Sequence, residues 1–312
     1  MCRSTGARVV VLAATVAVLT SCTTFPAAGP PTSGDGCAVP ATAVSDRPAS
    51  LRVGSTVRHY TWSASGRTGP KPLVIDIHGL LEGVIAGVHP DMSQYTPKAH
   101  DEGFVVAYPI GENGGVNWEL GEDTPSLRFI DELLVQLRAD ACIDPARIYV
   151  TGLSYGATMT TQLMCYRSEV FAAAAPVAGL LRPDNAGVIN PGNCNPTRRV
   201  PVVTFHGESD PILPFDYFAP SPQAWATRYG CGPKTTTVEV ASDPVTRRPI
   251  RKDTWACDGT AVESWRIEGG GHAWPGSAFS TAIAGIVGLT PTSIDATDIS
   301  WEFFERFSLP AS

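Results

Sequence analysis

The segment with the clearest chemical meaning in this 312-residue chain is Gly152–Gly156, which reads Gly-Leu-Ser-Tyr-Gly. The residues Arg147–Thr151 before it are typical of a strand, and Ala157–Tyr166 after it are typical of a helix. A strand, a sharp turn with a central serine and a helix form a nucleophile elbow, in which the turn exposes the serine hydroxyl. Ser154 is therefore the candidate nucleophile. The alternative is a glycine-rich connection without chemistry, because the five-residue pattern alone is weakly specific.

A nucleophilic serine needs a base, and the base needs a carboxylate to orient it. After an elbow, the chain order is serine, acid, histidine. Of six histidines, only His206 and His272 follow Ser154. His272 lies in a glycine-flanked loop directly after the late predicted strand Val262–Ile267, so we assign it as the base. The alternative is a surface histidine without a role.

The acid should follow a strand between the serine and the base. Asp210 comes shortly after the apolar run Val200–Phe205 and is the first choice, with Asp216 second and Glu208 third. His206 precedes Asp210, so this order makes it a structural histidine at a strand end.

Negative charge that develops on a carbonyl oxygen needs two backbone N–H donors. One is expected from Tyr155, the residue after the nucleophile, and the other from Leu80, which follows His78-Gly79 at the end of an apolar run. Trp118 and Trp274, with Tyr155, are candidates for lining an apolar substrate pocket. The alternative for both tryptophans is ordinary packing.

These residues need a scaffold, and apolar runs alternate along the chain with segments of helical spacing. This alternation predicts an α/β fold with a mostly parallel sheet covered by helices on both faces. The segment Leu51–Ser63 predicts an opening antiparallel pair. We expect buried strands at Leu73–Ile77, Phe104–Tyr108, Arg147–Thr151, Phe171–Val177, Val200–Phe205 and Val262–Ile267, and helices at Leu127–Leu137, Ala157–Tyr166, Gln223–Tyr229 and Asp298–Phe307.

The N-terminus has the features of a targeting segment. Two arginines precede the apolar run Val9–Leu19, which is shorter than the roughly 20 residues that span a bilayer. The following Leu-Thr-Ser-Cys resembles a bacterial lipobox, so residues 1–21 are predicted to be a signal peptide and Cys22 the lipidated first residue. A plain secretory signal is the alternative. Residues 22–36 form a predicted flexible tether and 37–312 a single catalytic domain.

Six cysteines remain after Cys2 and Cys22 are set aside, which predicts three disulfides in an exported chain. Proximity along the chain favours Cys165–Cys194 and Cys231–Cys257, leaving Cys37–Cys142. Zinc is the weaker interpretation, because no Cys-x-x-Cys occurs and no histidine stands at ligand spacing from a cysteine. We expect no metal and no organic cofactor.

Composition excludes several classes of protein. The chain is 43% hydrophobic and 17% charged, which argues against disorder. Its net charge is −7, with no basic run, which argues against nucleic acid as a partner and against electrostatic docking on anionic lipid. The expected membrane contact is therefore the lipid anchor.

Longer motifs surround these residues: LVIDIHG (73–79), CIDPARIYVTGLSYGATM (142–159), AAAAPVAG (172–179), PVVTFHGESDPILPF (201–215), GGGHAWPG (269–276) and DATDISWEFF (295–304). Through them the chain resembles α/β-hydrolases of the group that holds polyhydroxybutyrate depolymerases, feruloyl esterases and acetylxylan esterases, and especially actinobacterial esterase lipoproteins of that group. One departure is Pro125-Ser126, where such enzymes often carry an aspartate pair; we expect Ser126 to cap that helix.

The resemblance implies an extracellular or membrane-anchored serine esterase that acts on polyester, feruloyl or acetyl-polysaccharide substrates. Two other functions stay open. One is an acyltransferase of the same fold that passes the acyl group to an envelope sugar or lipid. The other is a non-catalytic envelope lipoprotein, which would not need Ser154, Asp210 and His272 together.

Overall fold

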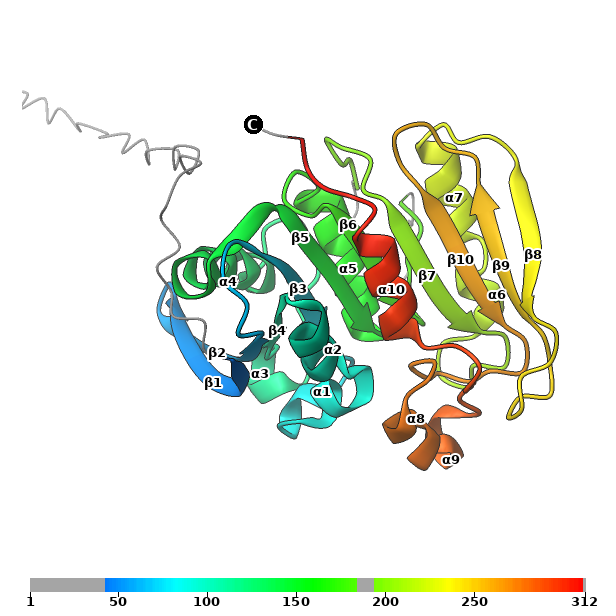
Figure 1. Ribbon diagram of the computed structural model, residues 1–312, viewed down its shortest axis with the longest axis horizontal. Coiled ribbons are helices and arrows are strands. Elements are labelled where there is room, and N and C mark those ends of the chain that lie inside the picture. The colour runs from blue at the N-terminus through cyan, green and yellow to red at the C-terminus, as the bar shows by residue number, and fades with distance from the viewer. Residues whose placement is uncertain (1–42, 184–193, 311–312) are drawn as a thin grey trace, which may run out of the picture. The chain divides into compact units, whose positions relative to one another are not determined.

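A ten-stranded sheet forms the centre of the computed structural model, which describes residues 43–183 and 194–310 (Figure 1). Its six central strands are parallel. In spatial order they are β4 (Val105–Pro109), β3 (Lys71–Ile77), β5 (Ile143–Leu153), β6 (Ala173–Val177), β7 (Val202–Gly207) and β10 (Val262–Ile267). The α/β class predicted from the alternation of strands and helices is thereby confirmed.

Antiparallel strands extend the sheet at both edges. On one side β2 (Thr56–Ala64) pairs with β4, and β1 (Val44–Val53) pairs with β2, as the predicted opening pair requires. On the other side β9 (Ile250–Trp255) pairs with β10, and β8 (Lys234–Val240) pairs with β9. The last strand of the chain, β10, therefore lies between β7 and β9.

Helices cover both faces of the sheet (Figure 1). On one face lie α4 (Pro125–Ala141), α5 (Tyr155–Tyr166) and α7 (Ser221–Arg228), and on the other lie α1 (Val88–Ser93), α2 (Tyr95–Glu102) and α10 (Ala296–Phe304). Shorter helices occupy the loops: η1 (Glu82–Val84), α3 (Glu112–Gly115), α6 (Phe215–Phe218), α8 (Ala278–Ala282) and α9 (Ala284–Val287).

Alternating side chains of the central strands supply both layers of the core. In β3, Leu73, Ile75 and Ile77 pack with α4 and α5, whereas Val74 packs with the layer of α2 and α10. Because both faces are covered, such a strand is apolar at consecutive positions. Lys71 and Asp76 are the ionisable exceptions in β3, and Asp76 is fully buried.

Some elements differ from the expectations. The helices α1 and α2 and the strands β8 and β9 were not predicted. The cap of α4 was predicted wrongly, because Thr124 and not Ser126 accepts the N–H of Leu127. Pro125 occupies the first helical position, which makes the preceding residue the cap. The Ser126 hydroxyl instead accepts the N–H of Glu119.

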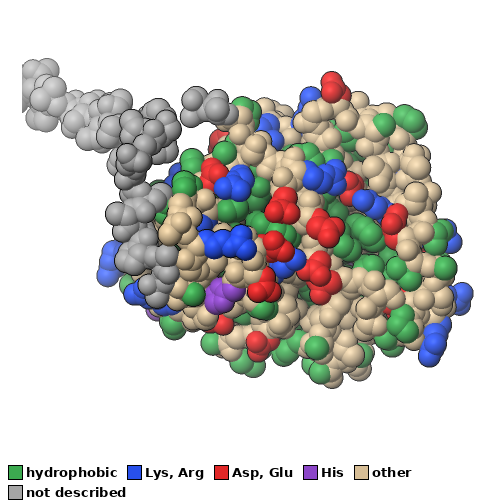
Figure 2. All heavy atoms as spheres, viewed as in Figure 1, with side chains coloured by type: hydrophobic (Ala, Val, Ile, Leu, Met, Phe, Trp, Pro, Cys, Tyr) green, Lys and Arg blue, Asp and Glu red, His purple; other side chains and the backbone are tan. Residues whose placement is uncertain are grey.

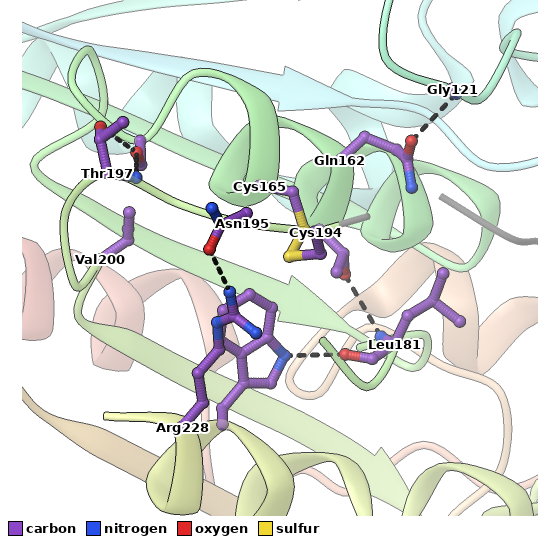
Figure 3. Close-up of a disulfide and its surroundings, with 12 residues drawn as sticks. Gly121, Gln162, Cys165, Leu181, Cys194, Asn195, Thr197, Val200 and Arg228 are labelled. Atoms are coloured by element: carbon purple, nitrogen blue, oxygen red, sulfur yellow. Dashed lines mark hydrogen bonds between the residues drawn. A yellow bond between two sulfur atoms is a disulfide. The ribbon is translucent and has the colours of Figure 1, made fainter. Parts of the chain in front are cut away.

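Two predicted disulfides are present. Cys165–Cys194 joins the last turn of α5 to the segment before β7 (Figure 3), and Cys231–Cys257 joins the end of α7 to the end of β9. Cys142 is also disulfide-bonded, but Cys37 lies outside the described residues, so its pairing with Cys142 stays a prediction. The predicted signal peptide (1–21), the Cys22 lipidation site and the tether (22–36) lie outside them as well.

Charges of both signs are interspersed on the face that carries α2 and α10 (Figure 2). Lys98 of α2 pairs there with Glu102 of the same helix and with Asp298 of α10. Within residues 43–183 and 194–310, no helix combines the length and apolarity needed to cross a bilayer.

A buried carboxylate fixes two loops near the end of the chain. Asp243 is fully buried and accepts four backbone N–H bonds at 2.9 Å, two from its own loop after β8 (Val245, Thr246) and two from the segment before α10 (Thr292, Ser293). Burial by itself would raise the pKa of Asp243, but these donors outweigh it and lower the pKa to about 2.

Asp243→Asn is expected to lower the free energy of unfolding by about 2 kcal/mol at neutral pH, because hydrogen bonds to a charged group are stronger than neutral ones. The carboxylate's contribution is fully present above its unfolded-state pKa, near 3.8, and is lost as the pH falls toward its folded pKa of about 2. Urea unfolding of both proteins at neutral pH and near pH 3 measures this difference. Asp258→Asn, in an exposed turn, is the control. Equal midpoints for Asp243→Asn and wild type at neutral pH would contradict the prediction.

Candidate active site

The carboxyl ends of β3, β5, β7 and β10 lie at one edge of the sheet, because these strands run parallel. Four predicted site residues follow these strand ends: Leu80 after β3, Ser154 after β5, Asp210 after β7 and His272 after β10. The fold therefore brings loops that are far apart in the sequence to a common edge, as ligand sites of parallel sheets require.

Ser154 occupies a strained backbone conformation between β5 and α5. Its φ of 59° and ψ of −117° are rare for a residue with a side chain, and such strain persists only where neighbours enforce it. The Ser154 N–H donates to the carbonyl of Val177 at 2.9 Å, and its carbonyl accepts the N–H of Thr158 at 3.0 Å. The turn thus has the geometry of a nucleophile elbow.

The glycines of the elbow are required by close backbone contacts. A Cβ atom on Gly156 would lie 1.9 Å from the carbonyl oxygen of Ile77, and one on Gly152 would lie 2.5 Å from the same atom. Both distances are far below van der Waals contact, and the obstacle is backbone that cannot rotate away. The first turn of α5 is therefore packed directly against the end of β3.

Gly156→Ala is expected to destabilise the protein by about 2 kcal/mol and to reduce any Ser154-dependent activity strongly, because helix and strand must separate to admit the methyl group. Thermal unfolding and labelling of Ser154 by a fluorophosphonate measure the two effects. Gly285→Ala is the matched control, because its added methyl group would meet no atom within 4 Å. A Gly156→Ala protein that melts and labels like wild type would refute the packing argument.

His272 and Asp210 form a buried hydrogen-bonded pair. The distance from His272 Nδ1 to Asp210 Oδ2 is 2.7 Å, and both residues are at most 7% exposed. The other carboxylate oxygen, Oδ1, accepts the N–H groups of Ile212 and Leu213 at 2.8 Å each. A carboxylate that accepts the Nδ1 proton fixes the ring tautomer and leaves the lone pair on Nε2.

Asp210 also contacts His206, whose Nε2 lies 3.3 Å from Oδ2 and 3.0 Å from the carbonyl oxygen of Leu213. Burial alone would raise the pKa of Asp210, but hydrogen bonds from His206 and His272 outweigh it and hold the pKa well below its usual range. The other two acid candidates lie elsewhere. Asp216 is exposed, and Glu208 pairs with Arg266 at 3.4 Å.

The nucleophile and base candidates follow strands that end at the same edge of the sheet, and no hydrogen bond joins their side chains among the described residues. Among the described residues, the Ser154 hydroxyl makes no hydrogen bond. Catalytic hydrogen bonds in ligand-free enzymes are often long and tighten when substrate binds. The site therefore contains the candidate base–acid pair and, on the neighbouring turn, a serine whose hydroxyl is free to react.

Two backbone donors are free at the expected oxyanion positions. The N–H of Leu80 has no hydrogen-bond partner in the described structure, although Gly79 donates to Glu82 and Leu81 donates to Val116 on either side of it. Tyr155 supplies the first N–H of α5, which no intrahelical carbonyl can accept. The packing of Gly156 on Ile77 holds these two segments together.

Comparison with known proteins identifies this architecture. Residues 125–235 match the phospholipase/carboxylesterase family. Feruloyl esterase B of Piromyces equi is 32% identical over 49% of this chain and 29% of its own length. The bifunctional acetylxylan esterase/xylanase XynS20E of Neocallimastix patriciarum is 24% identical over 80% of this chain and 33% of its own length. The chain has the α/β-hydrolase fold.

Further comparisons agree with this assignment. The putative esterase NocK of Nocardia uniformis subsp. tsuyamanensis is 28% identical over 75% of this chain and 74% of the relative. A solved acetyl xylan esterase from Aspergillus awamori has a TM-score of 0.54 at 18% identity, covering 69% of this chain and 89% of that chain, which shows the common fold. This chain matches about a third of the length of the first two relatives.

Trp118 and Trp274 are packed in the interior of the protein. Trp118 and Trp274 are each 1% exposed, so the expectation that they line a substrate pocket finds no support in the structure. Trp118 donates its indole N–H to the carbonyl of His78 at 2.9 Å, and Trp274 donates to the Thr297 hydroxyl at 3.0 Å. Trp118 therefore supports the loop that carries Leu80. Tyr155 is half-buried.

Sequence reasoning missed a group of ionisable residues beneath the Leu80 loop: Asp76, Glu82 and His89. One signal was available, because an aspartate in the middle of the apolar run Leu73–Ile77 needs a buried partner. The partner's identity was not readable, since His89 lies in a short helix that the sequence pattern does not reveal.

Proposed function

We propose that the hydrolase cleaves carboxylic esters by way of a covalent acyl-enzyme, with Ser154, His272 and Asp210 as its triad. The observation that carries the proposal is the buried His272–Asp210 hydrogen bond at the sheet edge where the strained Ser154 turn also lies. The relatives named as feruloyl and acetylxylan esterases support the choice of ester hydrolysis.

Each group has a defined task in this proposal. Ser154 Oγ attacks the ester carbonyl while His272 Nε2 takes its proton, and Asp210 stabilises the imidazolium that forms. The N–H groups of Leu80 and Tyr155 hold the negative oxygen. The C–O bond of the ester then breaks, and the alcohol leaves with the proton from His272. Water attacks the acyl-enzyme with the same base and releases the acid and free Ser154.

The proposed substrates are polyesters, feruloyl esters or acetylated polysaccharides outside the cell. The names of the relatives support these ester classes. One of these relatives is poly(3-hydroxyalkanoate) depolymerase C of Paucimonas lemoignei, whose name supports the polyester class. The two disulfides Cys165–Cys194 and Cys231–Cys257 support an oxidising compartment. Anchoring through lipidated Cys22 is part of the proposal.

A series of p-nitrophenyl esters from acetate to palmitate, together with methyl ferulate, tests the proposal. Turnover should fall on the acid side, because a protonated His272 cannot accept the Ser154 proton. Product analysis with an added alcohol separates hydrolysis from acyl transfer, since transfer yields a new ester. A protein inert on every ester, or a rate that stays constant down to about pH 4, would contradict the proposal.

A further inference from the structure

A buried ionic cluster lies directly beneath the loop that carries Leu80. His89 of α1 is 3% exposed and contacts two carboxylates: its Nε2 lies 2.8 Å from Asp76 Oδ1 at the end of β3, and its Nδ1 lies 3.0 Å from Glu82 Oε2 in η1. The reaction described above uses none of these three side chains. The cluster therefore needs a separate explanation.

The geometry requires a charged ring. A neutral imidazole has one N–H, so it could donate to only one of two carboxylates, and its bare nitrogen would face the other. Burial by itself would lower the pKa of His89, but Asp76 and Glu82 outweigh it and raise the pKa to about 10. Burial lowers the pKa of the nearby His78 to about 4, so this ring is neutral beside His89, and the ring of Tyr108 lies edge-on, 6.5 Å away. His89 is thus an imidazolium that bridges two carboxylates.

Glu82 connects His89 to the backbone of the Leu80 loop. The same oxygen that faces His89, Oε2, accepts the N–H of Gly79 at 2.6 Å. Glu82 therefore spans the turn in which Leu80 lies. That turn lacks apolar anchors of its own, because the side chains of Leu80 and Leu81 are 55% and 59% exposed. Its orientation depends on polar contacts.

We propose that His89 is a positioning residue for the oxyanion hole: it couples Glu82 to Asp76 and so holds the Gly79–Leu80 peptide with the Leu80 N–H toward the reacting carbonyl. This inference rests on the proposed function. A misplaced donor weakens contacts made to the developing oxyanion and leaves substrate binding nearly untouched. The expected signature is a lower kcat with little change in KM.

The test uses Glu82→Gln, His89→Gln and the double variant. Each single variant is expected to lower kcat by about 10- to 100-fold, less than the loss of a whole oxyanion donor. KM should change less than about twofold, and a boronic acid that mimics the tetrahedral state should bind more weakly in parallel with kcat. Glu82 is only partly buried and Gln keeps its size, so this variant remains informative if His89→Gln unfolds.

The double variant tests whether the two residues act through one link. If they do, kcat of the double variant falls no further than that of the worse single variant, because the link is already broken. His59→Gln, on the exposed side of β2, is the matched control and should match wild type.

The inference is overturned if folded Glu82→Gln and His89→Gln proteins keep kcat within twofold of wild type. Losses that multiply in the double variant, or a higher KM at unchanged kcat, also overturn it. Failure of the proposed function has a different signature: wild type and Ser154→Ala are then equally inert, and the inference falls with it. If wild type is active and Ser154→Ala is inactive, the proposed function stands, and the kinetics of the Glu82 and His89 variants then decide whether His89 positions the oxyanion hole.

Discussion

Replacing Ser154 by alanine should lower kcat for ester hydrolysis by about 10⁴-fold or more while the protein stays folded. The variant has no atom that can attack the carbonyl, whereas the backbone contacts of the turn to Val177 and Thr158 are kept. The change removes a single oxygen, so we expect an unfolding temperature close to that of wild type. Turnover of p-nitrophenyl butyrate and thermal unfolding measure both quantities.

Covalent labelling gives an independent measure of the same prediction. A fluorophosphonate should add one label to wild type and none to Ser154→Ala, as read by intact mass. Ser55→Ala, in the exposed turn between β1 and β2, serves as the control and should label like wild type. Residual turnover in Ser154→Ala above about a tenth of wild type would assign the chemistry to another residue.

Asp210→Asn should lower kcat by a similar factor, about 10⁴-fold. The reason lies in the hydrogen bonds of the carboxylate. Oδ1 accepts two backbone N–H groups at 2.8 Å, so an asparagine must place its own oxygen there and turn its NH₂ toward His272. The ring must then accept at Nδ1 and carry its proton on Nε2, which removes the lone pair that Ser154 needs.

Asp216→Asn is the matched control for this prediction. Asp216 lies six residues further along the chain, in α6, and is exposed, and within the described residues no hydrogen bond or ion pair joins it to His272. Steady-state kinetics of both variants on one ester decide the assignment. If Asp210→Asn retained activity within tenfold of wild type while Asp216→Asn lost it, the acid would be Asp216 and the buried pair would be structural.

The parallel strands were predictable because they are buried on both faces. Leu73–Ile77 and Phe104–Tyr108 read as short apolar runs, and they overlap the central strands β3 and β4. Strand β8 was not predictable, since six of its seven residues are exposed and its sequence KTTTVEV shows no apolar alternation. Helix α2 buries only Tyr95 and Ala99, too few for a periodic signal.

The candidate site also has a part that the sequence predicts and a part that it does not. Ser154 is marked by its flanking glycines, and chain order leads to Asp210 and His272, which the structure joins at 2.7 Å. The contacts that support these residues have no sequence motif, because they depend on which segments pack against each other in the folded protein. The contact of Trp118 with His78 arises once the loops after β3 and β4 are packed together, and the bridging of two carboxylates by His89 arises once α1 packs against the end of β3.

The position of β10 between β7 and β9 sets the order in which the molecule can assemble during synthesis. The ribosome makes the Ser154 turn and its neighbours β3, β5 and β6 first. The pair β8–β9 joins the sheet only through β10, so it stays detached until that later strand emerges. His272 follows β10 directly. A nascent or prematurely terminated chain that stops before β10 therefore carries the proposed nucleophile without its proposed base, so the proposed activity requires the completed sheet.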